Sequence, residues 1–291
     1  MFASPDSLAE ALAGTGYLAD DGLATVSWLA HRLERPLLLE GEPGTGKTAL
    51  AEAVAELLDK PLIRLQCYEG IEASQALYDW DFPRQILHLR AVEALGKEAS
   101  DATELESELF AERFLQPRPI LRALREAPCV LLIDEVDRAD DEFEAFLLEV
   151  LSTWAVTIPE LGTIKATQPP FTVLTSNRTR ELHDALKRRC LYHWIEHPGL
   201  ERELAIVRTR LPEVDESLAN QVVHVVQRLR AEEDLVKPPG VAETLDWARA
   251  LDALGVSQLD PEVAASTLGA AIKYREDAER VRVALDRMLA R

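Results

Sequence analysis

The feature that most constrains the fold is a glycine-rich stretch, GEPGTGKT, at residues 41–48. It follows the apolar run 36–39 and precedes a helical pattern of apolar residues over 49–58. A strand that ends in a glycine-rich turn and opens into a helix presents unpaired backbone N–H groups and a positive helix end to a phosphate chain. The alternative, a fortuitous turn between a strand and a helix, gives Lys47 and Thr48 no role. We therefore predict a P-loop that binds a nucleotide.

Each residue type in this stretch has a physical reason to be there. Glycines allow the backbone to curl tightly without a Cβ clash. Lys47 is expected to reach the β- and γ-phosphates, and the Thr48 hydroxyl is expected to bind Mg²⁺, so the predicted cofactors are ATP and Mg²⁺. The predicted nucleotide-binding residues are Gly41, Glu42, Pro43, Gly44, Thr45, Gly46, Lys47, Thr48 and Ala49.

A second motif is the acidic pair Asp134-Glu135, which ends the apolar run that begins at Cys129. Ligands of parallel sheets collect beyond the carboxyl ends of the strands, so this pair is expected to meet the P-loop. Asp134 would join Thr48 in the Mg²⁺ shell, and Glu135 would orient or polarise the attacking water. An ordinary acidic strand end is the alternative, and the upstream P-loop counts against it. A glutamate that orients or polarises water favours hydrolysis over transfer of the phosphoryl group to a second substrate.

Three further polar residues are candidates for the site. Asn177 ends the apolar run that begins at Phe171, where its amide would hydrogen-bond the water or the γ-phosphate; a polar strand terminator is the alternative. Arg188 and Arg189 precede the next apolar run. Either guanidinium would neutralise charge on the transferred phosphoryl group, often in a neighbouring subunit, whereas a solvated basic helix end is the equally weighted alternative.

Strand-like and helix-like segments alternate up to His197, which predicts a parallel sheet covered by helices on both faces. We predict an α/β nucleotide-binding core over 1–197 and a helical subdomain over 198–291. Two helices are expected over 1–35, helices over 84–126, and a hairpin over 156–164. The aromatic segment 68–83 either packs onto the body or protrudes as a hairpin that touches a partner. Expected inward positions in the first two groups of helices include Leu8, Leu12, Val26, Leu29, Leu33, Leu95 and Leu105.

Composition excludes several classes of protein. The 291 residues carry a formal net charge of −19 and no long basic run, which argues against a general nucleic-acid-binding surface, although a basic channel formed on assembly stays open. The three cysteines are far apart and lack CxxC spacing, which fits reduced thiols. The six histidines form no convincing zinc set.

No signal peptide or membrane-spanning run is recognised, so we expect a cytoplasmic protein, with peripheral membrane attachment left open.

The order of these motifs resembles that of AAA+ ATPases. The stretch 41–48 looks like Walker A, 130–135 like Walker B, Asn177 like the sensor-1 residue, and 186–190 like the segment that carries an arginine finger. An insertion over 68–83 and a hairpin over 156–167 are similar to features of the MoxR group, as is the sequence DEVDRA that begins at Asp134. The sequence ALYDWDFPRQILH at 76–88 is similar to the CoxD-type branch, whose ATPases are linked to maturation of the molybdenum-copper carbon monoxide dehydrogenase.

The resemblance implies a P-loop AAA+ core with a five-stranded parallel sheet sandwiched by helices, followed by an all-α lid. It implies a ring, expected to be a hexamer, in which Arg189, with Arg188 as second choice, completes the next subunit's site. It also implies a von Willebrand factor A (VWA) domain partner and a client metalloenzyme that ATP hydrolysis remodels, matures or activates. One departure is the stretch 239–247, which lacks the sensor-2 arginine of many MoxR proteins; Arg249, a turn later, is a weak substitute.

Two alternatives to this function stay open. One is a nucleotide-controlled assembly scaffold, in which turnover is incidental. The other is an AAA+ activator of a different enzyme, such as a Rubisco-type or nitric-oxide-reductase-type client. A DNA-linked motor is a third class, and the acidic balance of the chain counts against it.

Overall fold

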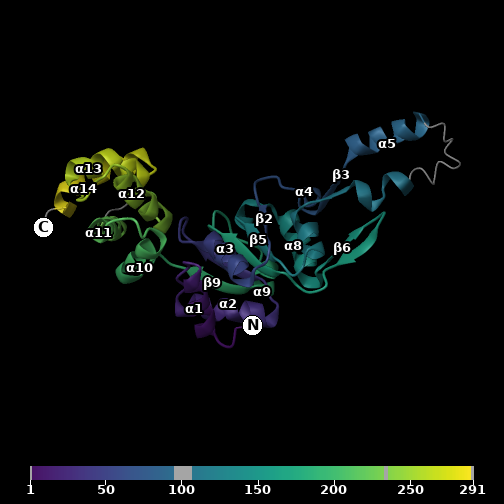
Figure 1. Ribbon diagram of the computed structural model, residues 1–291, viewed down its shortest axis with the longest axis horizontal. Coiled ribbons are helices and arrows are strands. Elements are labelled where there is room, and N and C mark those ends of the chain that lie inside the picture. The colour runs from purple at the N-terminus through teal and green to yellow at the C-terminus, as the bar shows by residue number, and fades with distance from the viewer. Residues whose placement is uncertain (1, 95–106, 233–234, 290–291) are drawn as a thin grey trace. The chain divides into compact units, whose positions relative to one another are not determined.

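The computed structural model describes residues 2–94, 107–232 and 235–289, and Figure 1 shows its helices and strands. The central sheet has five strands in the order β2-β5-β8-β1-β9. Strand β5 pairs in parallel with β2 on one side and with β8 on the other. The predicted parallel five-stranded sheet is therefore confirmed. Its strands are β1 (Leu37–Gly41), β2 (Leu62–Gln66), β5 (Val130–Asp134), β8 (Phe171–Ser176) and β9 (Leu191–Ile195).

Helices separate these strands and continue after β9. Before β9 they are α1 (Pro5–Gly14), α2 (Asp21–Leu33), α3 (Lys47–Leu58), α4 (Ala73–Leu77), α5 (Phe82–Ala94), α7 (Pro119–Arg125), α8 (Asp141–Thr153) and α9 (Asp184–Arg189), with 3-10 turns η1 (Glu112–Phe114) and η2 (Val136–Arg138). After β9 the described elements are α10 (Leu200–Arg210), α11 (Glu216–Glu232), α12 (Val241–Ala253), α13 (Pro261–Thr267), η3 (Leu268–Ala270) and α14 (Arg275–Leu289).

The chain forms two compact units. The P-loop unit comprises Met1–Thr25, Glu40–Ala53 and Trp194–Arg291, and the sheet unit comprises Val26–Leu39 and Val54–His193. The P-loop unit thus contains the glycine-rich stretch and the C-terminal helices. The sheet unit contains β2, β5 and β8. The predicted domain boundary after residue 197 stays a prediction.

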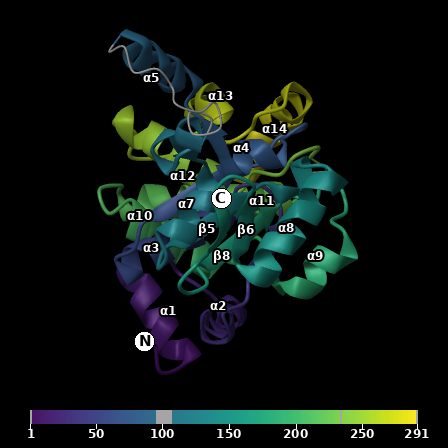
Figure 2. The ribbon, with the colours of Figure 1, turned by 90° about the vertical axis from the view of Figure 1, so that its right-hand side faces the viewer.

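The core of the sheet unit forms around β5, whose five residues are all buried, as expected for an apolar strand in a parallel sheet. Helix α8 packs against this core with Phe143, Leu147, Val150 and Leu151, which recur at helical spacing. Its first turn is capped by Asp140, which accepts a hydrogen bond of 2.9 Å from the Phe143 N–H. Figure 2 shows α8 beside α9, the short helix that carries the candidate arginines.

Two small antiparallel sheets extend the sheet unit. Strands β6 (Ala155–Ile158) and β7 (Gly162–Lys165) form the predicted hairpin. Strand β3 (Tyr78–Trp80) pairs instead with the distant β4 (Leu115–Pro117), so the aromatic segment forms no hairpin of its own. Its Tyr78 and Trp80 pack against the core, as the first alternative predicts. Figure 1 shows α5 standing away from β2 and β5; the expected inward residues Leu95 and Leu105 lie outside the described residues.

The C-terminal helices of the P-loop unit share a hydrophobic core that includes Trp247, which is fully buried. A buried ion pair lies within them. Both Arg230 terminal nitrogens donate to the Glu203 carboxylate, at 2.7 and 2.9 Å, and Arg230 Nε donates to the Pro239 carbonyl at 2.6 Å. The Thr244 hydroxyl also donates to Glu203, at 2.6 Å. Because a bidentate pair fixes geometry as well as energy, it holds the turn at Pro239 that starts α12.

Candidate active site

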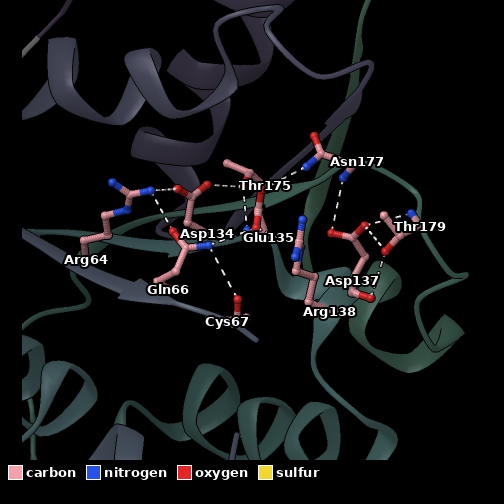
Figure 3. A network of polar contacts seen from close by, with 10 residues as sticks. All are labelled: Arg64, Gln66, Cys67, Asp134, Glu135, Asp137, Arg138, Thr175, Asn177 and Thr179. Atoms are coloured by element: carbon pink, nitrogen blue, oxygen red, sulfur yellow. Dashed lines mark hydrogen bonds and ion pairs between the residues drawn. The ribbon is translucent and has the colours of Figure 1, made fainter. Parts of the chain in front are cut away.

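The carboxylate of Asp134 lies at the carboxyl end of β5 and is almost completely buried. Its Oδ1 accepts a hydrogen bond of 2.5 Å from the hydroxyl of Thr175 on β8. The same hydroxyl oxygen accepts a hydrogen bond of 2.9 Å from the Glu135 N–H. One threonine therefore fixes both members of the acidic pair, and Figure 3 shows this arrangement.

Glu135 follows β5 in a left-handed backbone conformation, with φ 54° and ψ 49°. This conformation is uncommon for a residue with a Cβ, and such strain concentrates at functional sites. Three side chains hold its carboxylate: Asn177 Nδ2 donates to Oε1 at 3.3 Å, while Gln66 Nε2 and Arg138 Nε lie 3.1 and 2.9 Å from Oε2. The side chain of Glu135 is 30% exposed, so solvent water has access to it.

Asn177 is positioned by Asp137, a buried carboxylate in η2. Asp137 accepts hydrogen bonds from the Asn177 N–H at 3.2 Å, the Thr179 N–H at 2.8 Å and the Thr179 hydroxyl at 2.7 Å. These bonds tie the end of β8 to the turn after β5. The sheet unit thus brings together three of the predicted site residues, Asp134, Glu135 and Asn177.

In the P-loop unit, residues 41–48 run from the last residue of β1 into the first turn of α3, the order of strand, turn and helix that the sequence predicts. Gly44 and Gly46 have φ values of 77° and 90°, a region that glycine enters without steric cost. Lys47 is buried and begins α3, and its Nζ donates to the carbonyls of Gly41 and Glu42 at 2.8 and 2.7 Å. Its ammonium group therefore lies against the main chain of the glycine-rich stretch.

The start of α12 contacts this loop through backbone atoms. The Ala242 N–H donates to the Gly44 carbonyl at 3.2 Å, and a Cβ added to Gly240 would lie 2.7 Å from the Pro43 carbonyl oxygen. The side chain that approaches the loop here is acidic. Glu243 Oε2 would lie 2.7 Å from a Cβ added to Gly44, and it accepts a hydrogen bond of 2.9 Å from the Gly240 N–H. Arg249 is exposed further along the same helix. The contact between these helices and the P-loop consequently uses the backbone and a carboxylate at this point.

The candidate arginines are presented by the end of α9. Arg188 and Arg189 are exposed, and within the described residues neither guanidinium forms an ion pair. The Arg35 side chain binds the end of this helix, because its Nη2 donates to the carbonyls of Arg188, Arg189 and Cys190 at 2.9, 3.1 and 3.3 Å. An arginine that satisfies the last carbonyls of a helix fixes that end of the helix.

Burial makes the three thiols poor nucleophiles. It raises the pKa of Cys67 to about 12, of Cys129 to about 11 and of Cys190 to about 12. A thiol with such a pKa stays protonated at neutral pH. All three cysteines are free, which agrees with the expectation of reduced thiols. None of the three is therefore a thiolate nucleophile at neutral pH.

The predicted metal ligands are Thr48, in the P-loop unit, and Asp134, in the sheet unit. A hydroxyl and a carboxylate are hard oxygen donors of the kind that Mg²⁺ prefers, so these residue types fit the metal. The part of the chain that the structure describes holds no cluster of three His, Cys, Asp or Glu side chains suited to a metal ion.

Among the helices of the described residues, none combines the length and the apolar character that a membrane span needs.

Sequence reasoning missed several residues that build the site. Thr175, Asp137, Gln66 and Arg64 all hydrogen-bond to Asp134, Glu135 or Asn177, or to their backbone. Thr175 had a usable signal, since it lies on β8 two residues before Asn177, and alternate residues of an extended segment share a face. The others depend on the register between strands and on the turn after β5, and local spacing does not supply these.

Comparison with known proteins gives a family match over residues 36–190, to the model described as AAA domain (dynein-related subfamily). This match covers β1, the glycine-rich stretch, β5, β8 and α9.

Two relatives extend the similarity over more of the chain, and a third matches a short segment. The gas vesicle ATPase GvpN2 of Halobacterium salinarum is 25% identical over 94% of this chain and 80% of its own length. An uncharacterised protein of Staphylococcus saprophyticus is 21% identical over 82% of this chain and 84% of its own. Midasin of Giardia intestinalis is 46% identical over 48 residues, which are 16% of this chain and 1% of midasin.

Proposed function

Because the chain belongs to the AAA domain family, in its dynein-related subfamily, we propose that it uses ATP hydrolysis to remodel a client metalloenzyme in the manner of the MoxR group. The chain is an AAA+ ATPase, and its relatives include the gas vesicle ATPase GvpN2. In this proposal the client is matured or activated together with a VWA-domain partner, and carbon monoxide dehydrogenase of the molybdenum-copper type is one candidate client. The CoxD-like sequence at 76–88 supports that choice.

The single observation that carries hydrolysis is the position of Glu135. Its carboxylate lies within hydrogen-bond distance of Asn177 and is partly exposed, next to the buried Asp134. We assign Glu135 the role of the base that takes a proton from the attacking water, and Asn177 the role of orienting that water. Lys47 and the backbone N–H groups of residues 41–49 would bind the phosphates. Thr48 and Asp134 would hold Mg²⁺, which supplies charge neutralisation on the phosphates when bound.

The test of this function is ATP turnover by the purified chain, with and without Mg²⁺, over a range of protein concentrations. We expect Mg²⁺-dependent turnover whose rate per subunit rises cooperatively, because neighbouring subunits complete each site in a ring. Turnover that is negligible despite ATP binding would contradict the hydrolytic assignment and favour the nucleotide-controlled scaffold. The matching control is the same assay with the client and VWA protein absent and then added.

A trans-acting arginine gives a second expected result. Arg189→Ala and Lys47→Ala subunits should each be inactive alone, because each lacks one part of the site. Mixing them should restore part of the activity, since some interfaces then pair an intact P-loop with an intact Arg189. Arg188→Ala serves as the comparison that decides which arginine acts. Absence of recovered activity in mixed rings, detected by differently tagged subunits, would contradict the trans arrangement.

A further inference from the structure

An arginine with no assigned role lies beside the acidic pair. Arg64 and Gln66 stand two residues apart on β2, so both project from the same face of the strand. The register of β2 against β5 places Gln66 opposite Asp134. These two β2 side chains are therefore directed at the carboxyl end of β5, as Figure 3 shows.

The contacts form one connected chain. Arg64 Nη2 donates to Asp134 Oδ2 at 2.5 Å and to Gln66 Oε1 at 2.7 Å. Gln66 Nε2 in turn donates to Glu135 Oε2 at 3.1 Å. A single guanidinium nitrogen thus links the proposed metal ligand to the proposed base.

Arg64 and Thr175, which both donate to Asp134, differ in how easily they can leave. The Thr175 hydroxyl is buried and also accepts from the Glu135 N–H, so moving it would strand two polar groups. The Arg64 side chain is 50% exposed, whereas that of Asp134 is 4% exposed. An ion pair that one partner can leave for water is weak compared with a buried one. Of these two donors, Arg64 on Oδ2 is accordingly the one that water can more easily displace.

We propose that Arg64 is a displaceable counterion of Asp134 that competes with Mg²⁺ for this carboxylate. The inference rests on the proposed function, in which Asp134 belongs to the Mg²⁺ shell. Two cations that share one carboxylate repel each other, so Arg64 must move outward when the metal is bound.

The test measures how much Mg²⁺ nucleotide binding requires, and it does not depend on ATP turnover. Binding of a fluorescent ATP analogue is titrated with Mg²⁺ for the wild-type chain and for Arg64→Met, which keeps an apolar stem and removes the charge. The half-saturating Mg²⁺ concentration should fall about three- to tenfold in Arg64→Met. Arg64→Lys keeps a positive charge and should stay near the wild-type value. Arg122→Met is the matched control, because Arg122 forms an exposed pair with Glu126 on the same unit and should change nothing.

Two outcomes overturn the inference in distinguishable ways. If all variants bind the analogue equally well at saturating Mg²⁺ and Arg64→Met needs as much Mg²⁺ as the wild type or more, Arg64 does not compete with the metal and only this inference is wrong. If the wild-type chain fails to bind the analogue at all, the proposed function is wrong and the inference falls with it. Gln66→Leu completes the design: its Mg²⁺ requirement should match the wild type, and a shift as large as that of Arg64→Met would contradict the assignment to Arg64.

Discussion

Replacing Glu135 with glutamine is expected to lower ATP turnover by about 100-fold or more while nucleotide binding is retained. The amide of glutamine cannot take a proton from water, yet it preserves the size of the side chain and its capacity to accept from Asn177 Nδ2. The variant should therefore accumulate in an ATP-bound form. Phosphate release under steady-state conditions and binding of a fluorescent ATP analogue measure the two effects separately.

A matched control for this variant is Glu142→Gln, because Glu142 is an exposed acid in the first turn of α8. It changes the net charge by the same amount and should leave turnover unaffected. If Glu135→Gln hydrolyses ATP at the wild-type rate, Glu135 is not the base. The remaining acid at the end of β5 would then need re-examination as the group that activates water.

Lys47→Ala should weaken ATP binding by at least about 100-fold, because hydrogen bonds to charged groups are worth about 1.5–3 kcal/mol each and the lysine is expected to make more than one. The alanine variant also loses the two bonds that Nζ donates to the Gly41 and Glu42 carbonyls. Affinity is measured by titration with the fluorescent analogue in the presence of Mg²⁺.

Lys60→Ala is the corresponding control, since Lys60 is exposed beyond the end of α3. Its ATP affinity should equal that of the wild type. Normal affinity in Lys47→Ala would contradict the assignment of residues 41–48 as a phosphate-binding loop. A loss of affinity in both variants would instead point to a general effect of charge.

Local patterns predicted the elements that carry the site. The glycine-rich stretch and the acidic strand end are defined by consecutive residues, so their identity needs no knowledge of distant contacts. Helix α8 was equally predictable, because Phe143, Leu147 and Val150 repeat at helical spacing and all are buried. The position of Leu33 was predicted wrongly: it is the last residue of α2, where the helical face ends, and it is 54% exposed.

Features that depend on distant pairing were not predictable. Strand β3 pairs with β4 although α5 and η1 lie between them in the sequence, and no repeat or spacing links the two strands. The same holds for the side chains of Arg64 and Gln66, which reach the acidic pair because β2 and β5 pair in one register. A shift of that register by one residue would turn both side chains to the opposite face. Sequence spacing within one strand cannot fix this choice.

The way in which Arg35 binds the end of α9 has a consequence for how such a protein diverges. Among the described residues, the Arg35 side chain donates its hydrogen bonds to main-chain carbonyls of residues 188–190. A carbonyl is the same whichever residue carries it, so the stability of this helix end is uncoupled from the identity of the side chains at positions 188 and 189. Substitutions at these two positions would therefore change the stability of the fold little. A lineage could therefore lose the proposed trans-acting arginine, move it by one position or regain it through single substitutions, with the scaffold that presents it intact.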